Sequence, residues 1–165
     1  MKNYLKSFGI LFLTSLFLFS CQPKVNLEKE KKDIMDYLEL AKKANIESDY
    51  ATWTSLYAKN CVYVMNGEVK NYTRDEIEKL SKESFENSKV KYTSIEDLSE
   101  PIIHISNDGT MAWYIVNSKF NYTYTDSLGN EQSNSAEGAS LFILEKEDGK
   151  WVEVTGFNSG KPKKK

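Results

Sequence analysis

The sequence has few of the residues from which metal sites and disulfide frameworks are built. Its 165 residues contain two cysteines, Cys21 and Cys61, and a single histidine, His104. Protein zinc sites usually need four ligands at short, characteristic spacings, and Cys61 and His104 form none of these spacings. We therefore expect no metal site.

The chain also lacks an excess of basic residues and the glycine-rich loops that hold phosphates. It has 22 Lys and Arg against 24 Asp and Glu, for a formal net charge of -2. Nucleic-acid binding depends mainly on clustered Lys and Arg, so we do not expect nucleic acid as a partner. Neither Gly-x-x-x-x-Gly-Lys nor Gly-x-Gly-x-x-Gly occurs, so we expect no nucleotide and no other cofactor.

Long hydrophobic runs are confined to the beginning of the chain. Lys2 and Lys6 flank the start of an apolar stretch over residues 8–19. A basic start followed by a short apolar run is typical of a secretory signal peptide, and the run is too short for a permanent transmembrane helix. We predict that residues 1–20 are a signal peptide.

The signal peptide ends in Leu18-Phe19-Ser20-Cys21, which resembles the lipobox of bacterial lipoproteins. The resemblance implies that the Cys21 thiol carries lipid and anchors the mature chain to a membrane. Residues 21–26 would then be a tether of at most ~18 Å. Gln22 stands where aspartate would indicate inner-membrane retention, so we expect a place in the bacterial cell envelope, on the outer membrane and facing the periplasm.

The first half of the mature chain is predicted to be mainly helical. Apolar residues from Asn26 to about Ser48 recur at helical spacing and predict a long amphipathic helix. Ser48 or Asp49 is suited to cap a second, short helix that begins at Tyr50. A short strand, Cys61–Met65, and a helix after the capping box Thr73–Glu76 follow.

The second half reads as a sheet, because Val, Ile, Thr and aromatic residues dominate from Val90 onward. Turn sequences at 107–109, 126–130 and 147–150 separate four strand-like stretches and predict three successive hairpins, an antiparallel meander. With Cys21 lipidated, Cys61 has no disulfide partner and is expected to be a buried strand thiol. Residues 160–165 are expected to be a basic tail.

This order of elements resembles the nuclear transport factor 2-like superfamily, which includes the SnoaL-like domains. Local support comes from Ser48–Trp53, between the first two helices, and from the final hairpin, Glu145–Val154. The resemblance implies an α+β, cystatin-like fold over residues 27–159. In that fold a curved antiparallel sheet wraps around the long N-terminal helix and forms a cone with an internal pocket.

Acid–base chemistry finds little support in the sequence. The isomerase-like members of the superfamily have an acidic base near the strand that follows the second helix, but no carboxylate occurs here before Glu68. Strand alternation places His104 on one face with Ile102, where we expect a surface or rim histidine. As a proton shuttle it would need a carboxylate on a neighbouring strand, either Glu137 or Glu153. We therefore assign no catalytic residue and lean against an enzyme.

Aromatic residues are abundant, and rings with a polar tip suit both a core and a ligand pocket. The helix–strand junction and the central hairpin usually line the cavity of this fold, and on that ground we predict the ligand-binding residues Tyr57, Tyr63, Trp113 and Asn117. The leading hypothesis is a lipid-anchored pocket domain that binds a small hydrophobic molecule or a partner. The alternatives are an isomerase, dehydratase or hydrolase of small hydrophobic substrates, and a dimerising structural module.

Overall fold

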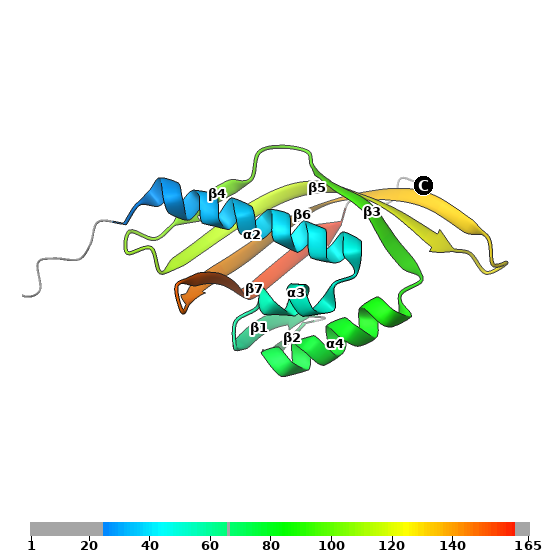
Figure 1. The fold of residues 1–165 in the computed structure, drawn as a ribbon, viewed down its shortest axis with the longest axis horizontal. Coiled ribbons are helices and arrows are strands. Elements are labelled where there is room, and N and C mark those ends of the chain that lie inside the picture. Colours follow the sequence, from blue (N-terminus) through cyan, green and yellow to red (C-terminus); the bar gives the residue numbers. More distant parts are fainter. Residues whose placement is uncertain (1–24, 66, 161–165) are drawn as a thin grey trace, which may run out of the picture.

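A computed structural model describes residues 25–65 and 67–160 of the chain. The predicted signal peptide, Cys21 and nearly all of the basic tail lie outside the described residues. The described part is an α+β domain in which helices cover one face of a curved antiparallel sheet (Figure 1). No helix within 25–65 and 67–160 is long and apolar enough to cross a membrane.

The long first helix, α2, spans Leu27–Glu47 and lies across the sheet, as Figure 1 shows. The Asn26 side chain accepts a hydrogen bond from the Lys29 amide and begins the helix, and Ser48, with a left-handed φ of 55°, ends it. Its buried face includes Ile34, Tyr37 and Leu38, which confirms the predicted amphipathic helix.

Two further helices and a small hairpin lie along one edge of the main sheet (Figure 1). Helix α3 (Tyr50–Ser55) is capped by Asp49, and α4 (Arg74–Asn87) begins at Thr73 with the predicted capping box. Strand β1 (Asn60–Met65) was expected, but its partner β2 (Glu68–Thr73) was not. The sequence EVKNYT alternates too weakly in hydrophobicity to reveal a strand, because β2 has few buried side chains.

The main sheet contains β3 (Val90–Asp97), β4 (Ile102–Ile105), β5 (Met111–Thr125), β6 (Glu131–Glu147) and β7 (Lys150–Gly160). Its order is β3-β5-β6-β7, and β4 pairs with the first part of β5. The three predicted hairpins are therefore confirmed. The β5–β6 hairpin extends beyond the helices as an arm (Figure 1).

The main hydrophobic core lies between α2 and the sheet and includes Ile34, Leu38, Tyr114, Leu144 and Trp151. A second cluster joins β1, α4 and β7 through Cys61, Ile77 and Val152.

A buried polar contact fixes the start of α2 on the sheet. The Trp151 indole N–H donates to Glu30 Oε2 at 3.0 Å, and Lys146 Nζ lies 2.6 Å from the same oxygen. The Lys146 ammonium also lies 5.0 Å from the centre of the Trp151 ring. The carboxylate thus has both a cation and a hydrogen-bond donor, which offset the cost of burying its charge.

The Leu144 side chain is fully buried, so Leu144→Ala should create a cavity in the main core. We expect a loss of about 2–5 kcal/mol in the free energy of unfolding, measured by urea denaturation. Leu128→Ala is the matched control, because Leu128 is 84% exposed on the β5–β6 turn and should change stability by less than about 0.5 kcal/mol. Equal losses in the two variants would contradict this core.

Candidate functional site

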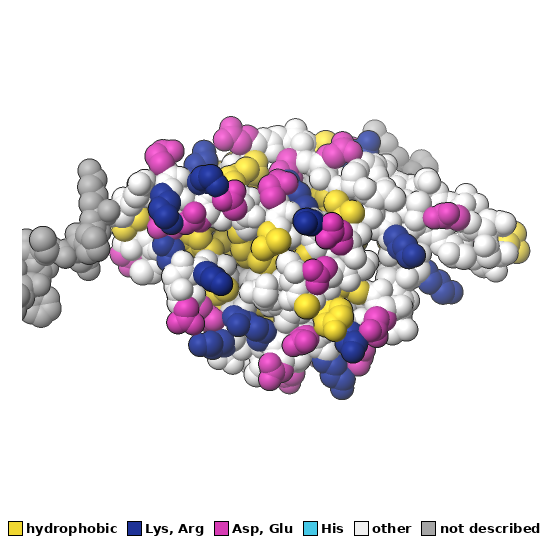
Figure 2. All heavy atoms as spheres, viewed as in Figure 1, with side chains coloured by type: hydrophobic (Ala, Val, Ile, Leu, Met, Phe, Trp, Pro, Cys, Tyr) yellow, Lys and Arg dark blue, Asp and Glu magenta, His cyan; other side chains and the backbone are white. Residues whose placement is uncertain are grey.

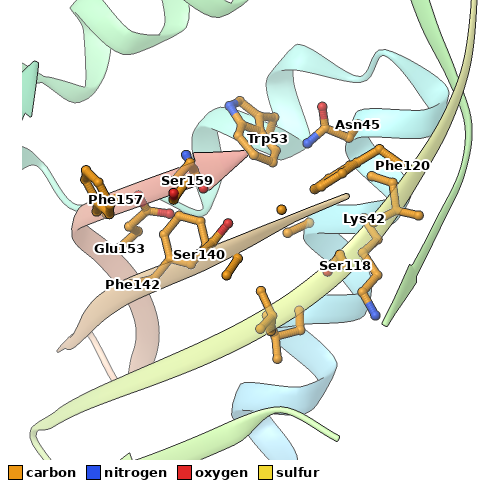
Figure 3. Close-up of a pocket in the computed structure, with 18 of the residues that line it drawn as sticks. Lys42, Asn45, Trp53, Ser118, Phe120, Ser140, Phe142, Glu153, Phe157 and Ser159 are labelled. Carbon is orange, nitrogen blue, oxygen red and sulfur yellow. The ribbon is translucent and has the colours of Figure 1, made fainter. Parts of the chain in front are cut away.

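A cavity of about 1040 Å³ lies between the sheet, α2, α3 and the β1–β2 hairpin. Figure 3 shows Lys42 from α2 and Glu153 from β7 on opposite sides of this pocket, with Trp53 and Phe142 beside the same space. Its wall is rich in aromatic rings: Tyr37, Trp53, Tyr57, Tyr63, Tyr114 and Phe142. At its rim, Val64, Leu80 and Phe157 are at least half exposed.

Glu153 is the buried carboxylate of this cavity, with only 4% of its surface exposed. The Tyr63 hydroxyl donates to Glu153 Oε1 at 2.6 Å, and the Tyr37 hydroxyl donates to Oε2 at 3.5 Å. Tyr63 comes from β1 and Tyr37 from α2, so the carboxylate links three separate elements. Its backbone is also held, since Ala58 N–H donates to the Glu153 carbonyl at 2.8 Å.

Burial raises the pKa of Glu153 from an ordinary 4.5 to about 7, and the hydrogen bonds from Tyr63 and Tyr37 only partly oppose this rise. Burial also raises the pKa of Tyr63 and of Tyr57, and the nearby Glu153 charge raises both further. Near neutral pH the tyrosines are therefore hydrogen-bond donors, while Glu153 exchanges between its acid and its carboxylate form.

A second polar group lies in the wall away from Glu153. Lys42 Nζ is 2.6 Å from Asp97 Oδ2 and 2.8 Å from Glu39 Oε1, and the buried Ser118 hydroxyl donates to Asp97 Oδ1 at 3.1 Å. Two carboxylates therefore neutralise the only positively charged side chain among the described residues that line the cavity.

The local sequence explains why Glu153 points inward. Trp151 and Glu153 lie two residues apart on β7, so strand alternation turns both toward the core. A bulge follows, because Leu144 pairs with Glu153 while Ile143 pairs with Thr155. Gly156 then leaves room that a side chain would fill: a Cβ there would come within 2.4 Å of the Phe142 ring and 2.9 Å of Glu153 Oε1.

The structure brings together only two of the four predicted ligand residues. Tyr57 and Tyr63 line the cavity. The other two, Trp113 and Asn117, are not among its lining residues, because they alternate on β5 with the inward residues Tyr114, Val116 and Ser118. Their expected place in the cavity is therefore corrected, since they lie on the opposite face of the sheet. Ligand binding by Tyr57 and Tyr63 stays a prediction.

The single histidine also lies on this outer face. His104 is exposed and pairs across strands with Trp113, and the two rings stack at 5.2 Å. It is not among the cavity-lining residues, so it cannot exchange a proton directly with Glu153. The surface position predicted for His104 is confirmed, whereas a His104–Glu153 pair is ruled out by the two faces of the sheet.

Cys61 is a buried thiol, as predicted, with 1% of its surface exposed. Burial raises its pKa from 9.0 to about 11, so it is a thiol and a poor nucleophile at neutral pH. Among the described residues no group of three or more His, Cys, Asp or Glu is arranged to hold a metal ion.

Sequence reasoning did not single out Glu153 as a site residue in its own right. The resemblance to the superfamily implies a base after the second helix, and Glu153 was expected only as a possible partner of His104. The signal that was available is the alternation in Trp151-Val-Glu153, which puts the glutamate on the same face as a core tryptophan.

A helix-covered, curved antiparallel sheet with an internal cavity is the nuclear transport factor 2-like fold, and solved structures agree. A nuclear transport factor 2-like protein from Salmonella enterica has a TM-score of 0.67 at 16% identity, covering 83% of this chain and 94% of that one. A similar protein from Cytophaga hutchinsonii gives a TM-score of 0.57 at 17% identity, with 79% and 97% covered.

A candidate scytalone dehydratase from Novosphingobium aromaticivorans gives a TM-score of 0.59 at 14% identity, with 80% of this chain and 81% of that chain covered. The sequence model of the SnoaL-like domain matches residues 34–156. This chain therefore belongs to the SnoaL-like domain family. A search of curated proteins found no significant match.

The raised pKa of Glu153 should make the protein less stable as the pH rises. Between about pH 4.5 and about pH 7, Glu153 is more often protonated in the folded state than in the unfolded state. The stabilisation from this protonation is therefore complete below about pH 4.5 and is lost as the pH rises to about 7. We expect the loss to be on the order of 3 kcal/mol by pH 8.

The measurement is urea denaturation at several pH values, comparing the wild type with Glu153→Gln and with Glu145→Gln. Glu145 is exposed on β6, so its variant should keep the wild-type pH dependence. Glu153→Gln should lose the part of the pH dependence of stability that comes from Glu153. A pH dependence that is unchanged in Glu153→Gln would show that Glu153 titrates normally.

Proposed function

We propose that this SnoaL-like domain binds a small molecule with a largely apolar body, and that Glu153 and Tyr63 recognise its polar group. The main observation in support of this proposal is a buried carboxylate in an aromatic-lined cavity, 2.6 Å from a tyrosine hydroxyl. The volume of about 1040 Å³ is just above the range of ordinary ligand pockets, which measure about 300–1,000 Å³.

The proposal includes a place in the cell envelope. If Cys21 carries lipid, the tether of residues 21–26 holds the domain within ~18 Å of the membrane. The surface that bears the helices has interspersed Lys, Arg, Asp and Glu side chains, with apolar patches between them, as Figure 2 shows. Such mixed charge fits a domain that works beside a membrane without binding its surface through a single basic patch. A homodimer through another face stays a prediction.

A fluorescent probe and a cavity-filling variant test the binding function. The neutral dye N-phenyl-1-naphthylamine, added to the chain from Gln22 onward, should give a saturable rise in fluorescence. Val116 lines the cavity, so Val116→Trp should weaken this binding at least about tenfold. The matched control is Ile115→Trp, since Ile115 is the adjacent residue of β5 and is 37% exposed on the other face.

Two results would count against a binding cavity. One is no saturable signal in the wild type. The other is equal weakening by Val116→Trp and Ile115→Trp, which would mean that the dye binds elsewhere. Circular dichroism and urea denaturation of both variants would show whether each remains folded.

The second candidate function is acid–base catalysis, as in an isomerase or dehydratase. The observation that favours it is a carboxyl group whose pKa of about 7 suits both accepting and returning a proton, next to a tyrosine that donates a hydrogen bond. The candidate scytalone dehydratase shares the fold alone. In such a reaction the Glu153 carboxylate would remove a proton from a carbon atom beside a carbonyl, and Tyr63 would stabilise the charge on the carbonyl oxygen.

Proton exchange by a model ketone tests the catalytic candidate. In deuterated buffer, 2-tetralone loses its C1 protons, and ¹H NMR follows the rate. A catalytic Glu153 predicts that the wild type accelerates the exchange over buffer and that Glu153→Gln removes at least about 90% of the acceleration. Equal rates for wild type and Glu153→Gln would reject Glu153 as the base and leave the binding function as it stands.

A further inference from the structure

The Glu153 carboxylate is buried without a cationic partner among the described residues. The hydroxyls of Tyr63 and Tyr37, which are neutral donors, form hydrogen bonds to the carboxylate. The other buried glutamate, Glu30, does have a cationic partner, because Lys146 Nζ lies 2.6 Å from its carboxylate. A buried carboxylate normally needs such a cation. When Glu153 is ionised, the cavity therefore contains a carboxylate that lacks a cationic partner among the described residues.

The positively charged side chain in the described part of the cavity wall, Lys42, is already paired with other carboxylates. The lining also includes the carboxyl groups of Asp97 and Glu137. Asp97 and Glu39 already surround Lys42, at 2.6 and 2.8 Å. An anionic ligand would meet like charges with no free counter-charge on the described wall, whereas a cationic ligand would supply the missing one.

The rings next to Glu153 are also suited to a cation. Tyr37, Tyr57, Tyr63 and Tyr114 come from α2, the segment after α3, β1 and β5. Burial raises the pKa of each of them, and the nearby Glu153 charge raises it further. Tyrosine faces attract an ammonium group within about 6 Å through their quadrupole, most strongly where water is excluded. Two of these tyrosines contact the carboxylate through their hydroxyls, and all four rings line the same cavity, a setting that suits an ammonium group.

We propose that the cavity binds an organic cation, a protonated amine on an aromatic or alicyclic body, with its ammonium group at the Glu153 carboxylate. This inference rests on the proposed binding function and names its ligand class. The bound amine forms the salt bridge that the protein lacks, while the body lies against Phe142, Trp53 and the tyrosine rings.

The pH dependence of binding follows from the groups around Glu153. Those that face it are Tyr37, Tyr57, Tyr63, Tyr114 and the thiol of Cys61, and all of them stay neutral below pH 8 because their pKa values are raised. Lys42 stays charged at the far side of the pocket (Figure 3). Glu153 alone among them titrates near 7, so amine binding below that pH releases a proton.

Three probes on one skeleton test the charge preference: 2-naphthylmethylamine, 2-naphthalenemethanol and 2-naphthoate. Isothermal titration calorimetry at pH 8, with the chain from Gln22 onward, should show the amine binding about tenfold or more tightly than the alcohol. The naphthoate should bind more weakly than the alcohol. The amine affinity should fall as the pH is lowered from 8 to 5.5, and the alcohol affinity should not.

Glu153→Gln keeps the size of the side chain and removes the charge. The variant should weaken the binding of the amine at least about tenfold and the binding of the alcohol by less than about twofold. Glu145→Gln, on the exposed part of β6, should leave both unchanged. The cation proposal would be overturned if the amine bound no more tightly than the alcohol, or if Glu153→Gln left the amine affinity unchanged. The proposed binding function would still stand in either case. If none of the three probes binds, the binding function itself fails.

Discussion

The hydrogen bond from Tyr63 to the buried Glu153 carboxyl is the interaction on which the rest of the site depends. It connects β1, which belongs to a separate two-stranded sheet, to β7 at the edge of the main sheet. The weaker contact from Tyr37 adds the long helix α2. Three elements that are distant in sequence therefore meet at one carboxyl group, and their meeting point is the inner wall of the cavity.

The cost of this arrangement is the desolvation of Glu153, and the protein does not offset it as it does for Glu30. At Glu30 the ammonium of Lys146 and the indole of Trp151 complete the site. At Glu153 only hydroxyl groups are present among the described residues, so its acid form persists to about pH 7. A folded domain that tolerates such a group has a polar centre suited to a ligand or a proton.

Much of the fold was predictable because local signals and the global arrangement agree. Asn26, Asp49 and Thr73 cap the helices, and three turns separate the long strands. The site was less predictable because it depends on register and on side-chain direction. Trp113 and Asn117 differ from the cavity residues Tyr114 and Val116 by one position on a strand, which reverses the face. Tyr63 and Glu153 are 90 residues apart, and only the packing of β1 against β7 joins them.

The environment of the buried carboxyl group is tested most directly by the pKa of Glu153 itself, measured by a ¹³C carboxyl NMR titration of the chain from Gln22 onward and assigned with Glu153→Gln. We expect a midpoint near 7 in the wild type. Tyr63→Phe should raise the midpoint, because the hydrogen bond from Tyr63 stabilises the ionised form and the variant lacks it. A midpoint near the ordinary value of 4.5, unchanged in Tyr63→Phe, would contradict a desolvated, tyrosine-bound carboxyl group.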